Sequence, residues 1–504
     1  MNVYPVTQGD FSHDGYEVWV NNQKVALDAA RVSLVPFNRR WPGHQRQLDQ
    51  SELVNFLSMA SDEPLNFRIR PKKPFEKVTV RPLSLGIVPE VSADGDITFT
   101  LEKPAYFTVE PYCRENALHI FVDPLCEYNI NKGTQDVIYY GAGIHEVGDI
   151  VLKSNQTLFI DEGAVVYGSI KAIDAENIKI IGKGILDNSH NKEVILYEAN
   201  VENNFAAVNN ATRQHTIQLE YCTNVEIEGI TIRDSLVYNI RPIGCENLKI
   251  SNVKIIGCWR FNSDGIDMHN CVNVDIDNCF LRTFDDSICI KGFDCYYDGD
   301  VEEAVQKAMY RNGKAYDIFT NVRVRNCVIW NDWGKCLEIG AETRAKEIYD
   351  IVFEDCRIIH VTHPVLDCYN VDYADVHDIT YRNIDVEYDD VIPHPLMQKS
   401  DNHKYESKDL DYVPNLIAVM VQFHPEYSAG GARRGKNHHL VFENIRCFGR
   451  QKIKFSFGGH NDEYCSEDII VRDIFVNGKP LREGEYDLIL RDFARNITVE
   501  CQKG

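Results

Sequence analysis

The chain has 504 residues, and 44% of them are hydrophobic, which allows a large core and excludes wholesale disorder. A formal net charge of −23 argues against nucleic acid or an anionic membrane surface as a partner. No apolar run is long enough to cross a membrane, and residues 1–6 lack the features of a signal peptide. The 16 cysteines show neither zinc-site spacing nor a compact disulfide pattern. We therefore expect reduced, buried thiols, a cytoplasmic location and no cofactor.

Residues 1–130 contain short strand-like segments bounded by Pro, Gly, Asn and Asp, at 16–20, 67–70, 77–80 and 97–101. This pattern predicts a small β-sandwich domain. The segment 36–46 is a long loop rich in aromatic and basic residues, and it includes Trp41. Such a loop is either a flap over a sugar site, in this chain or in a second subunit, or a loop packed between domains.

Residues 131–504 are repetitive. Steps of 23 and 26 residues separate Asn224, Asn247 and Asn273, each of which is followed by alternating apolar and polar residues. Asn or Asp before an apolar residue or Cys also recurs once in each repeat, as at Asn278 and Asn326. A repeat of this length, built of strands and turns, predicts a parallel β-helix, which we expect to be right-handed. The fold class is thus all-β, a β-sandwich followed by a β-helix. Two insertions, at 294–317 and 390–436, are expected to wall a cleft.

One carboxylate and then an adjacent pair, Asp264, Asp285 and Asp286, are separated by about the length of one coil, with a strand-like segment at 273–279 between them. Coils that stack would bring all three to one place. Converging carboxylates are what hydrolysis of a glycosidic bond needs, since one group protonates the leaving oxygen and another activates water or attacks. Three crowded carboxylates cannot all ionise easily, so one pKa should be raised. The alternative is an acidic dipeptide on a solvated surface.

Several aromatic, basic and polar residues lie in the same coils and are candidates for sugar binding or for structural roles. They are Trp259, Arg260, Arg241, His269, Trp333 and Arg344. Lys335 is either a ligand for an acidic sugar or a surface lysine. Glu338 is either a fourth acid in the cleft or the partner of a lysine such as Lys335.

The stretch from Asn262 to Gly292 resembles the active-site coils of glycoside hydrolase family 28, the polygalacturonases. The chain as a whole is also similar to family 49, the dextranase and isopullulanase group, in which a β-sandwich precedes a β-helix. The resemblance implies an inverting glycosidase acting on α-linked oligosaccharides. It implies that Asp285 is the general acid, that Asp264 and Asp286 hold and deprotonate water, and that Lys291 binds sugar or tunes charge.

The sequence departs from the polygalacturonase pattern at two points. Gly334-Lys335-Cys336 stands where the family has Gly-His-Gly, and no Arg-Ile-Lys occurs at a matching place. These departures leave both an acidic and a neutral sugar open.

Two rival functions remain. One is a calcium-dependent polysaccharide lyase, in which the carboxylates hold the metal and Lys335 is the base. The other is a non-catalytic carbohydrate-binding β-helix, which the fold alone permits. Neighbouring coils lie about 4.8 Å apart, a spacing nearer to that of retaining enzymes than of inverting ones. The sugar, the linkage, endo or exo action and the formation of a homo-oligomer stay open.

Overall fold

The computed structural model describes residues 1–39, 46–190, 215–293, 309–407, 409–425, 427–428, 433–450 and 452–501. Trp41 and residues 294–308 of the first insertion therefore lie outside the described residues. Within the described part, no helix is long and apolar enough to cross a membrane.

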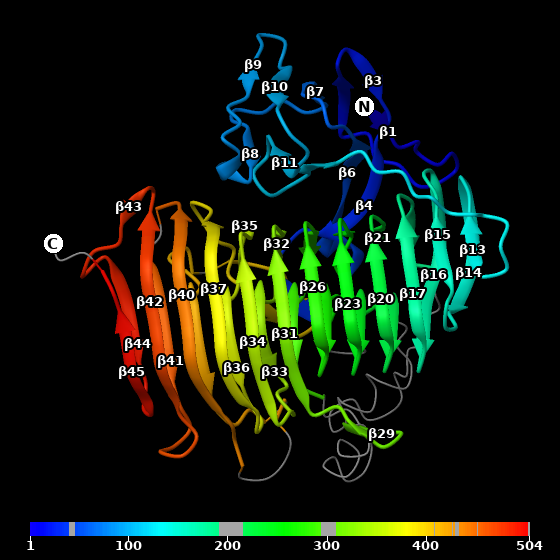
Figure 1. Cartoon of the computed structure of the whole chain (residues 1–504). Coiled ribbons are helices and arrows are strands. Elements are labelled where there is room, and N and C mark those ends of the chain that lie inside the picture. Colours follow the sequence, from blue (N-terminus) through cyan, green and yellow to red (C-terminus); the bar gives the residue numbers. More distant parts are fainter. Residues whose placement is uncertain are drawn as a thin grey trace.

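The N-terminal domain consists of two packed sheets, drawn in blue in Figure 1. One sheet has the order β1-β6-β12-β11-β8, with β4 also paired to β6, and the other has the order β3-β2-β7-β10-β9. Side chains such as Val18, Phe67, Phe107 and Ile120 fill the space between them. The strands and short 3-10 helices are β1 Asn2–Val3, β2 Tyr16–Val20, β3 Gln23–Val25, β4 Asp28–Ser33, β5 Phe37–Arg39, η1 Leu48–Gln50, β6 Ser51–Ala60, β7 Leu65–Pro71, β8 Thr79–Arg81, η2 Leu83–Leu85, β9 Glu90–Val91, β10 Ile97–Leu101, β11 Tyr106–Glu110 and β12 Leu118–Asp123.

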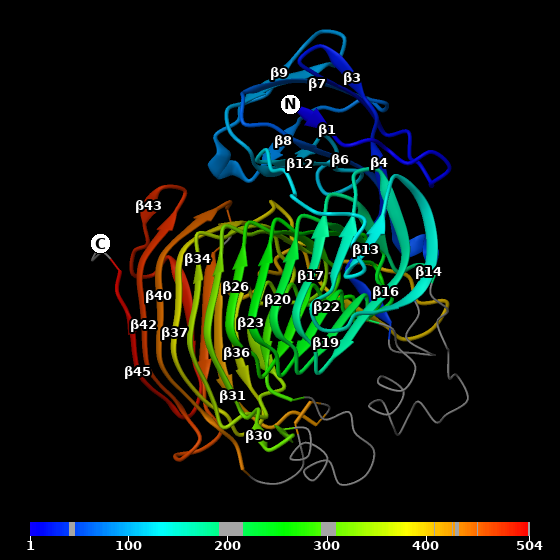
Figure 2. The same ribbon diagram turned by 45° about the vertical axis from the view of Figure 1, so that its right-hand side comes forward.

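The rest of the chain winds into a solenoid whose strands pair almost entirely in parallel (Figures 1 and 2). The pairing divides it into three long faces. The first face comprises β13 Val137–Tyr140, β15 Thr157–Ile160, β17 Glu176–Gly182, β20 Thr223–Glu228, β23 Glu246–Ser251, β26 Val272–Asp277, β31 Ile318–Arg325, β34 Glu347–Glu354, β37 Asp375–Glu387, β40 Lys436–Phe448, β42 Ser466–Val476 and β45 Ala494–Val499.

The second face, here called the domain face, comprises β18 Ile185–Asp187, β21 Thr231–Arg233, β24 Lys254–Ile256, β27 Phe280–Thr283, β32 Val328–Asn331 and β35 Arg357–His360. The third, the site face, comprises β19 Ile217–Glu220, β22 Ile240–Ile243, β25 Ile266–His269, β28 Ile288–Lys291, β33 Leu337–Ala341, β36 Leu366–Asn370, β39 Ile417–Val421, β41 Ile453–Gly458 and β44 Tyr486–Leu490. β16 Ala164–Ile173 continues both of these faces, because it pairs in parallel with β18 and with β19, and β14 Gly143–Val151 pairs in parallel with β16. Outside the faces are β29 Tyr310–Arg311, β30 Lys314–Ala315, β38 Leu396–Gln398 and β43 Lys479–Pro480. This arrangement confirms the predicted β-sandwich followed by a parallel β-helix.

The repeats stack because equivalent residues of successive coils pair in register. Val225 pairs with Leu248, Leu248 with Val274 and Val274 with Val322, and all four point into the core. In the first half of each of these strands, an Asn takes a positive φ, which Asn tolerates better than most residues. Asn224, Asn247, Asn273 and Asn321 each donate a side-chain hydrogen bond to the Asn of the preceding coil, at 2.7–3.0 Å. The described cysteines are all free, and most are buried in the solenoid.

The N-terminal domain packs on the domain face. Phe56 and Phe121 of the sandwich share one apolar cluster with Phe280, Val328 and Trp330 of the solenoid. Buried ion pairs flank this cluster: Asp10 contacts Arg233 at 2.8 Å, and Asp123 contacts Lys254 at 3.1 Å. Charges paired in this way hold two surfaces in one orientation, because a displacement would leave a buried charge alone.

Candidate active site

A cavity of about 430 Å³ opens on the site face, where the turns before β25, β28 and β33 meet. Such a volume lies within the usual range of small-molecule sites. The cavity is lined by Asn38, Tyr238, Phe261, Asn262, Asp264, Asp285, Asp286, Lys291, Trp333, Gly334, Lys335, Glu338, Ala341, Glu342, His363, Tyr369, Met397, His424 and Tyr427. All three predicted catalytic residues are therefore in one place.

The carboxylates of Asp264, Asp285 and Asp286 each place an oxygen within 4.8 Å of the other two. Stacked turns create this convergence: the Gly265 N–H donates to the Asp286 carbonyl at 2.8 Å, and the Asp285 N–H to the Ser263 carbonyl at 3.4 Å. Asp264 is 1% exposed, whereas Asp285 and Asp286 are only partly buried. The two adjacent acids are thus the ones most accessible from the cavity.

Two neighbours fix the turn that carries the acidic pair. A Cβ on Gly334 would lie 2.5 Å from the Asp285 carbonyl carbon, so only glycine lets the following coil pack this closely. Asn331 is fully buried, and its side-chain amide donates to the Asp285 carbonyl at 2.8 Å and to the Ser287 hydroxyl at 3.1 Å. A buried, fully bonded amide holds a turn in one conformation.

Lys291, the last residue of β28, is the register partner of His269, the last residue of β25. Its Nζ is 3.0 Å from Asp267, 3.7 Å from Glu342, and 3.9 Å from both Asp264 and Asp286. Lys291 is 5% exposed. One buried ammonium therefore supplies positive charge to two of the three converging carboxylates and to two acids beside them.

The surroundings shift the pKa values of two of these three carboxyls in opposite directions. Burial, followed by the negative charges of Asp267 and Asp285, raises the pKa of Asp264 well above its ordinary value. Burial also acts against ionisation of Asp286, but Lys291 and Lys335 outweigh it and lower the pKa of that group. The cluster can therefore hold a proton and a charged carboxylate at the same pH, which acid–base catalysis requires.

Lys335 is paired with acids of its own. Its ammonium contacts the carboxylates of Glu338 and, at 2.6 Å, of Asp367, while its backbone N–H donates to Asp286 at 2.8 Å. The sequence offered two roles for Glu338, and the structure shows both, since Glu338 pairs with Lys335 and also lines the cavity. Burial, followed by the charge of Asp286, raises the pKa of Glu338 well above its ordinary value.

Aromatic side chains form much of the wall. Trp333 stacks on Phe284 with ring centres 5.9 Å apart, and His424 stacks on Tyr427 at 4.3 Å. Ring faces of this kind pack against the apolar faces of sugars. His424, Tyr427 and Met397 come from the 390–436 insertion, which confirms that this insertion walls the cleft.

The N-terminal domain also reaches the cavity. β5 pairs in parallel with β38 of the insertion, which places Asn38 beside Met397, and both line the cavity. The Arg39 guanidinium contacts Asp401 at 2.9 Å. Residues 37–39 of the predicted loop are therefore a strand, and this strand borders the site, as the flap interpretation requires. Residues 40–45 of that loop lie outside the described residues.

Five predicted sugar-binding residues do not line the cavity. The Trp259 indole N–H donates to Asp234 at 3.0 Å, Arg260 pairs with the same carboxylate, and the Trp259 carbonyl accepts from Arg46 at the domain interface. The other three, Arg241, His269 and Arg344, are buried beside the site. Arg344 contacts Asp372 at 3.4 Å, and the His269 ring hydrogen-bonds the Gly292 carbonyl at 2.9 Å. Burial, aided by Arg241 and Lys291, lowers the pKa of His269 to about 3.

Sequence reasoning missed several lining residues, among them Glu342, His363 and Tyr369. One signal could have found Tyr369. The segment Leu366-Asp367-Cys368 repeats the pattern of Leu337-Glu338-Ile339, and the two strands pair in exactly that alignment, so Asp367 and Tyr369 fall on the outward side of the site face.

The carboxylate oxygens of Asp264, Asp285 and Asp286 could also coordinate a divalent cation, as could the set Asp286, Cys289 and Glu338. Lys291 already supplies positive charge 3.9 Å from two of these carboxylates. A metal would compete with that ammonium.

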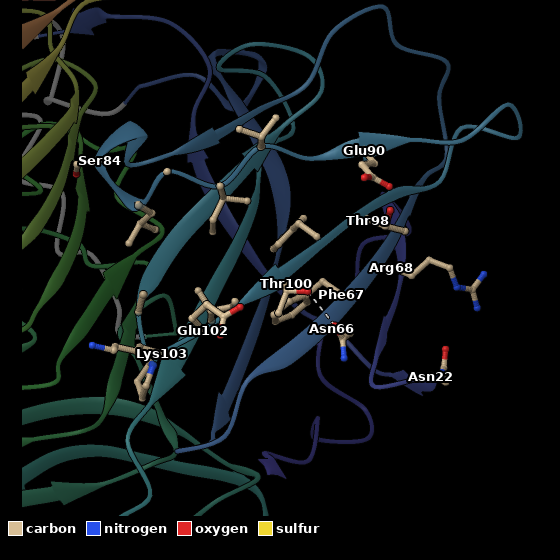
Figure 3. Close-up of a pocket in the computed structure, with 18 residues that line it drawn as sticks. Asn22, Asn66, Phe67, Arg68, Ser84, Glu90, Thr98, Thr100, Glu102 and Lys103 are labelled. Atoms are coloured by element: carbon tan, nitrogen blue, oxygen red, sulfur yellow. Dashed lines mark hydrogen bonds between the residues drawn. The ribbon is translucent and has the colours of Figure 1, made fainter. Parts of the chain in front are cut away.

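A larger cavity, of about 920 Å³, lies in the N-terminal domain beside β7 and β10 (Figure 3). Its labelled acids, Glu90 and Glu102, come from different segments and do not point toward each other in Figure 3. This cavity offers no converging carboxylates among its lining residues, so the chemistry is assigned to the smaller one.

Comparison with known proteins agrees with this geometry. A "Probable polygalacturonase" from Vitis vinifera is 26% identical over 200 residues, which are 35% of this chain and 40% of the relative. A "Polygalacturonase" from Gossypium barbadense is 25% identical over 301 residues, or 57% of this chain and 70% of the relative. The chain therefore spans less than half of the grape protein and about two thirds of the cotton protein.

Among solved structures, Dex49A from Penicillium minioluteum superposes with a TM-score of 0.53 at 13% identity, covering 97% of this chain and 96% of that one. At this identity the likeness shows the fold, over nearly the whole of this chain. The sequence model of the glycosyl hydrolases family 28 matches residues 141–409. This range is more than half of the chain and includes every acidic residue that lines the cavity. The chain belongs to the glycosyl hydrolases family 28.

Proposed function

We propose that this protein hydrolyses α-linked oligosaccharides of the pectin type, with inversion at the anomeric carbon. The observation that carries the proposal is the convergence of Asp264, Asp285 and Asp286 within 4.8 Å in an aromatic-walled cavity. Membership of family 28 and relatives named polygalacturonases support the substrate class. The free, buried cysteines suit a reducing compartment, and a cytoplasmic location is part of the proposal.

The three aspartates differ in their exposure to the cavity and in their pKa shifts, and these differences suggest a role for each. Asp285 is partly exposed to the cavity and can reach a leaving-group oxygen, so we assign it as the general acid. The lowered pKa of Asp286 keeps that carboxylate ionised and able to accept a proton from water. Asp264 is buried beside it, and no described residue donates a hydrogen bond to its Oδ1, which suits it to position that water.

Stereochemistry is the finer part of the proposal. A separation of no more than 4.8 Å between carboxylate oxygens, taken for two acids alone, favours retention. Three carboxylates can instead hold one water between two of them while the third donates a proton. We propose inversion on that arrangement and on the resemblance of the acidic turns to those of family 28.

The cavity is bounded on one side by the pair formed by β5 and β38, with Asn38 and Met397 in its wall. A site blocked in this way accepts the end of a chain more readily than its middle. We therefore propose exo action on short oligosaccharides.

The test is a reducing-sugar screen on α-linked galacturonan, rhamnogalacturonan, arabinan and dextran oligosaccharides, with the Asp285→Asn variant alongside. Turnover that is lost in the variant supports the proposal. NMR of the first product formed then gives its anomeric configuration, and an anomer opposite to that of the substrate's cleaved bond supports inversion. Equal turnover by the variant contradicts the assignment of the acid.

The two rivals make different predictions in the same experiment. A calcium-dependent lyase would lose activity with a chelator and release an unsaturated product that absorbs in the ultraviolet. A binding protein would retain an oligosaccharide without ever releasing a reducing end.

A further inference from the structure

We propose that the cavity is built to take a neutral sugar beside Lys335 and to reject a uronate there. The inference rests on the proposed glycosidase function and specifies its substrate. It starts from the position of Lys335, where a cation could have received a sugar carboxylate.

Lys335 is already neutralised by the protein. Its ammonium contacts Glu338 on β33 and, at 2.6 Å, Asp367 on β36 of the next coil. Glu338 and Asp367 are 1% and 3% exposed, and they are direct register partners on β33 and β36. Strand pairing thus fixes two buried carboxylates around one ammonium before any substrate arrives.

Lys291, the other lysine in the described lining, is also neutralised by acids of the protein. Lys291 has four carboxylates within 3.9 Å, those of Asp264, Asp267, Asp286 and Glu342. Around these two lysines the described lining contributes five acids, namely Asp264, Asp285, Asp286, Glu338 and Glu342. The described lining therefore carries five acids against two lysines.

A uronate entering this cavity would bring a further negative charge close to Glu338 and Asp286. To bind Lys335 it would have to displace a carboxylate that is itself buried, and it would leave that carboxylate without its partner. Both effects disfavour binding of an acidic sugar, so the site would select neutral sugars by repelling charged ones. A neutral sugar meets no such penalty, because a hydroxyl group can donate to Glu338 and accept from Lys335 at once.

The wall nearest to Lys335 suits an uncharged ring. Its Nζ lies 4.8 Å from the centre of the Tyr369 ring, and Trp333 and His363 are in edge contact at 5.3 Å. All three rings line the cavity. The polar cluster would select hydroxyl groups while the aromatic wall packs against C–H groups of the sugar.

The experiment compares matched α-linked di- and trisaccharides in two forms, the uronate and its carboxyl-reduced counterpart, by kcat/KM with the native protein. We expect the reduced form to be preferred by about tenfold or more. Glu338→Gln should narrow that preference by about tenfold, because it frees Lys335 to meet a carboxylate. Glu354→Gln, which removes a carboxylate paired with Arg382 at 2.6 Å on the first face, is the matched control and should leave the ratio unchanged.

Lys335→Met provides a second variant that does not depend on Glu338. The inference expects it to reduce turnover of both forms alike, whereas a lysine that binds the substrate's carboxylate would lose only the uronate. Preference of the native protein for uronates, or selective loss of uronate turnover in Lys335→Met, overturns the inference and leaves the glycosidase intact. Hydrolysis of neither form of any pair overturns the proposed function itself, and the inference with it.

Discussion

Lys291 influences the charge state of the carboxyls that we propose to be catalytic. It is the largest influence that lowers the pKa of Asp286, while burial and like charges raise the pKa of Asp264. If Asp286 must be ionised, activity should fall only when the pH drops through the pKa of Asp286, which lies below its ordinary value of 3.8. If Asp264 positions the water in its protonated form, activity should also fall as pH rises through the raised pKa of Asp264.

Replacing the lysine tests this account. Lys291→Met should move the acidic limb of the kcat/KM profile to higher pH by about one unit, because Asp286 loses an opposite charge at 3.9 Å. Lys179→Met, which removes an exposed lysine paired with Glu226 on the first face, is the control and should leave the profile where it was. An acidic limb that stays in place in Lys291→Met would show that another group is titrating.

At this scale, the sequence was enough to predict where the three aspartates meet, because their spacing matches one coil. It was not enough to predict the roles of Trp259 and Arg260, whose partners are Asp234 and a neighbouring domain. Side chains of the same type at the same distance along the chain can point to either side of a turn. Only the packing of the turn decides which ones face the cavity.

Among the elements, the turn at residues 284–287 is the one on which the site depends. A Cβ at position 334 would come within 2.5 Å of the backbone of both Asp285 and Asp286, where no flexible side chain can yield. We expect Gly334→Ala to lower kcat by about a hundredfold or more, since a displacement of about 1 Å is enough for such a loss. The far-UV circular dichroism should remain native.

Gly133→Ala is the matched control for that substitution, because its Cβ would lie 3.7 Å from its nearest neighbour. Its activity should equal that of the native protein. Full activity in Gly334→Ala would mean that the turn adapts and that its geometry is less critical than the packing indicates.

The asparagine ladder is the second element that can be tested. Asn247 has a φ of 56° and both donates and accepts a ladder hydrogen bond. Asn247→Ala should lower the free energy of unfolding by about 2 kcal/mol, through lost hydrogen bonds and a left-handed backbone that Ala disfavours. Asn247→Gly keeps the backbone freedom and should cost about 1 kcal/mol, mainly from the lost hydrogen bonds. Urea unfolding of the two variants separates the contributions, and equal losses would contradict a backbone contribution.

The coils could be predicted from sequence because one alternating segment and one turn residue recur, and each copy specifies the same local structure. The pairing of β5 with β38 could not, because those strands belong to different domains and each is only three residues long. Such a short pair has no pattern of its own. It forms because the two domains hold its strands side by side.

For the whole molecule, the interface on the domain face joins the sandwich to the coils that carry the candidate site. Trp330 is completely buried there, among Phe280, Val328 and residues of the sandwich. Trp330→Ala should lower the free energy of unfolding by about 3–5 kcal/mol. Because the same strand leads to Asn331, which holds the acidic turn, activity should also fall.

Two measurements check this prediction: thermal unfolding reports the loss of stability, and limited proteolysis reports whether the domains separate more easily. If the interface couples the domains, Trp330→Ala should make the segment between them, at residues 124–136, more susceptible to cleavage. A variant with native stability and native cleavage would contradict the contribution of Trp330 to the domain interface.

The central claim is that Asp285 donates the proton to the leaving group. The direct measurement is kcat of Asp285→Asn on α-glycosides of one sugar, with leaving groups of increasing acidity. The control is Asp378→Asn, since Asp378 has a φ of 53° that Asn also accepts. We predict a loss of about 10³-fold for poor leaving groups, much smaller for good ones, and none in the control. Loss of the same size for every leaving group would contradict the assignment, and so would turnover of the variant equal to that of the native protein.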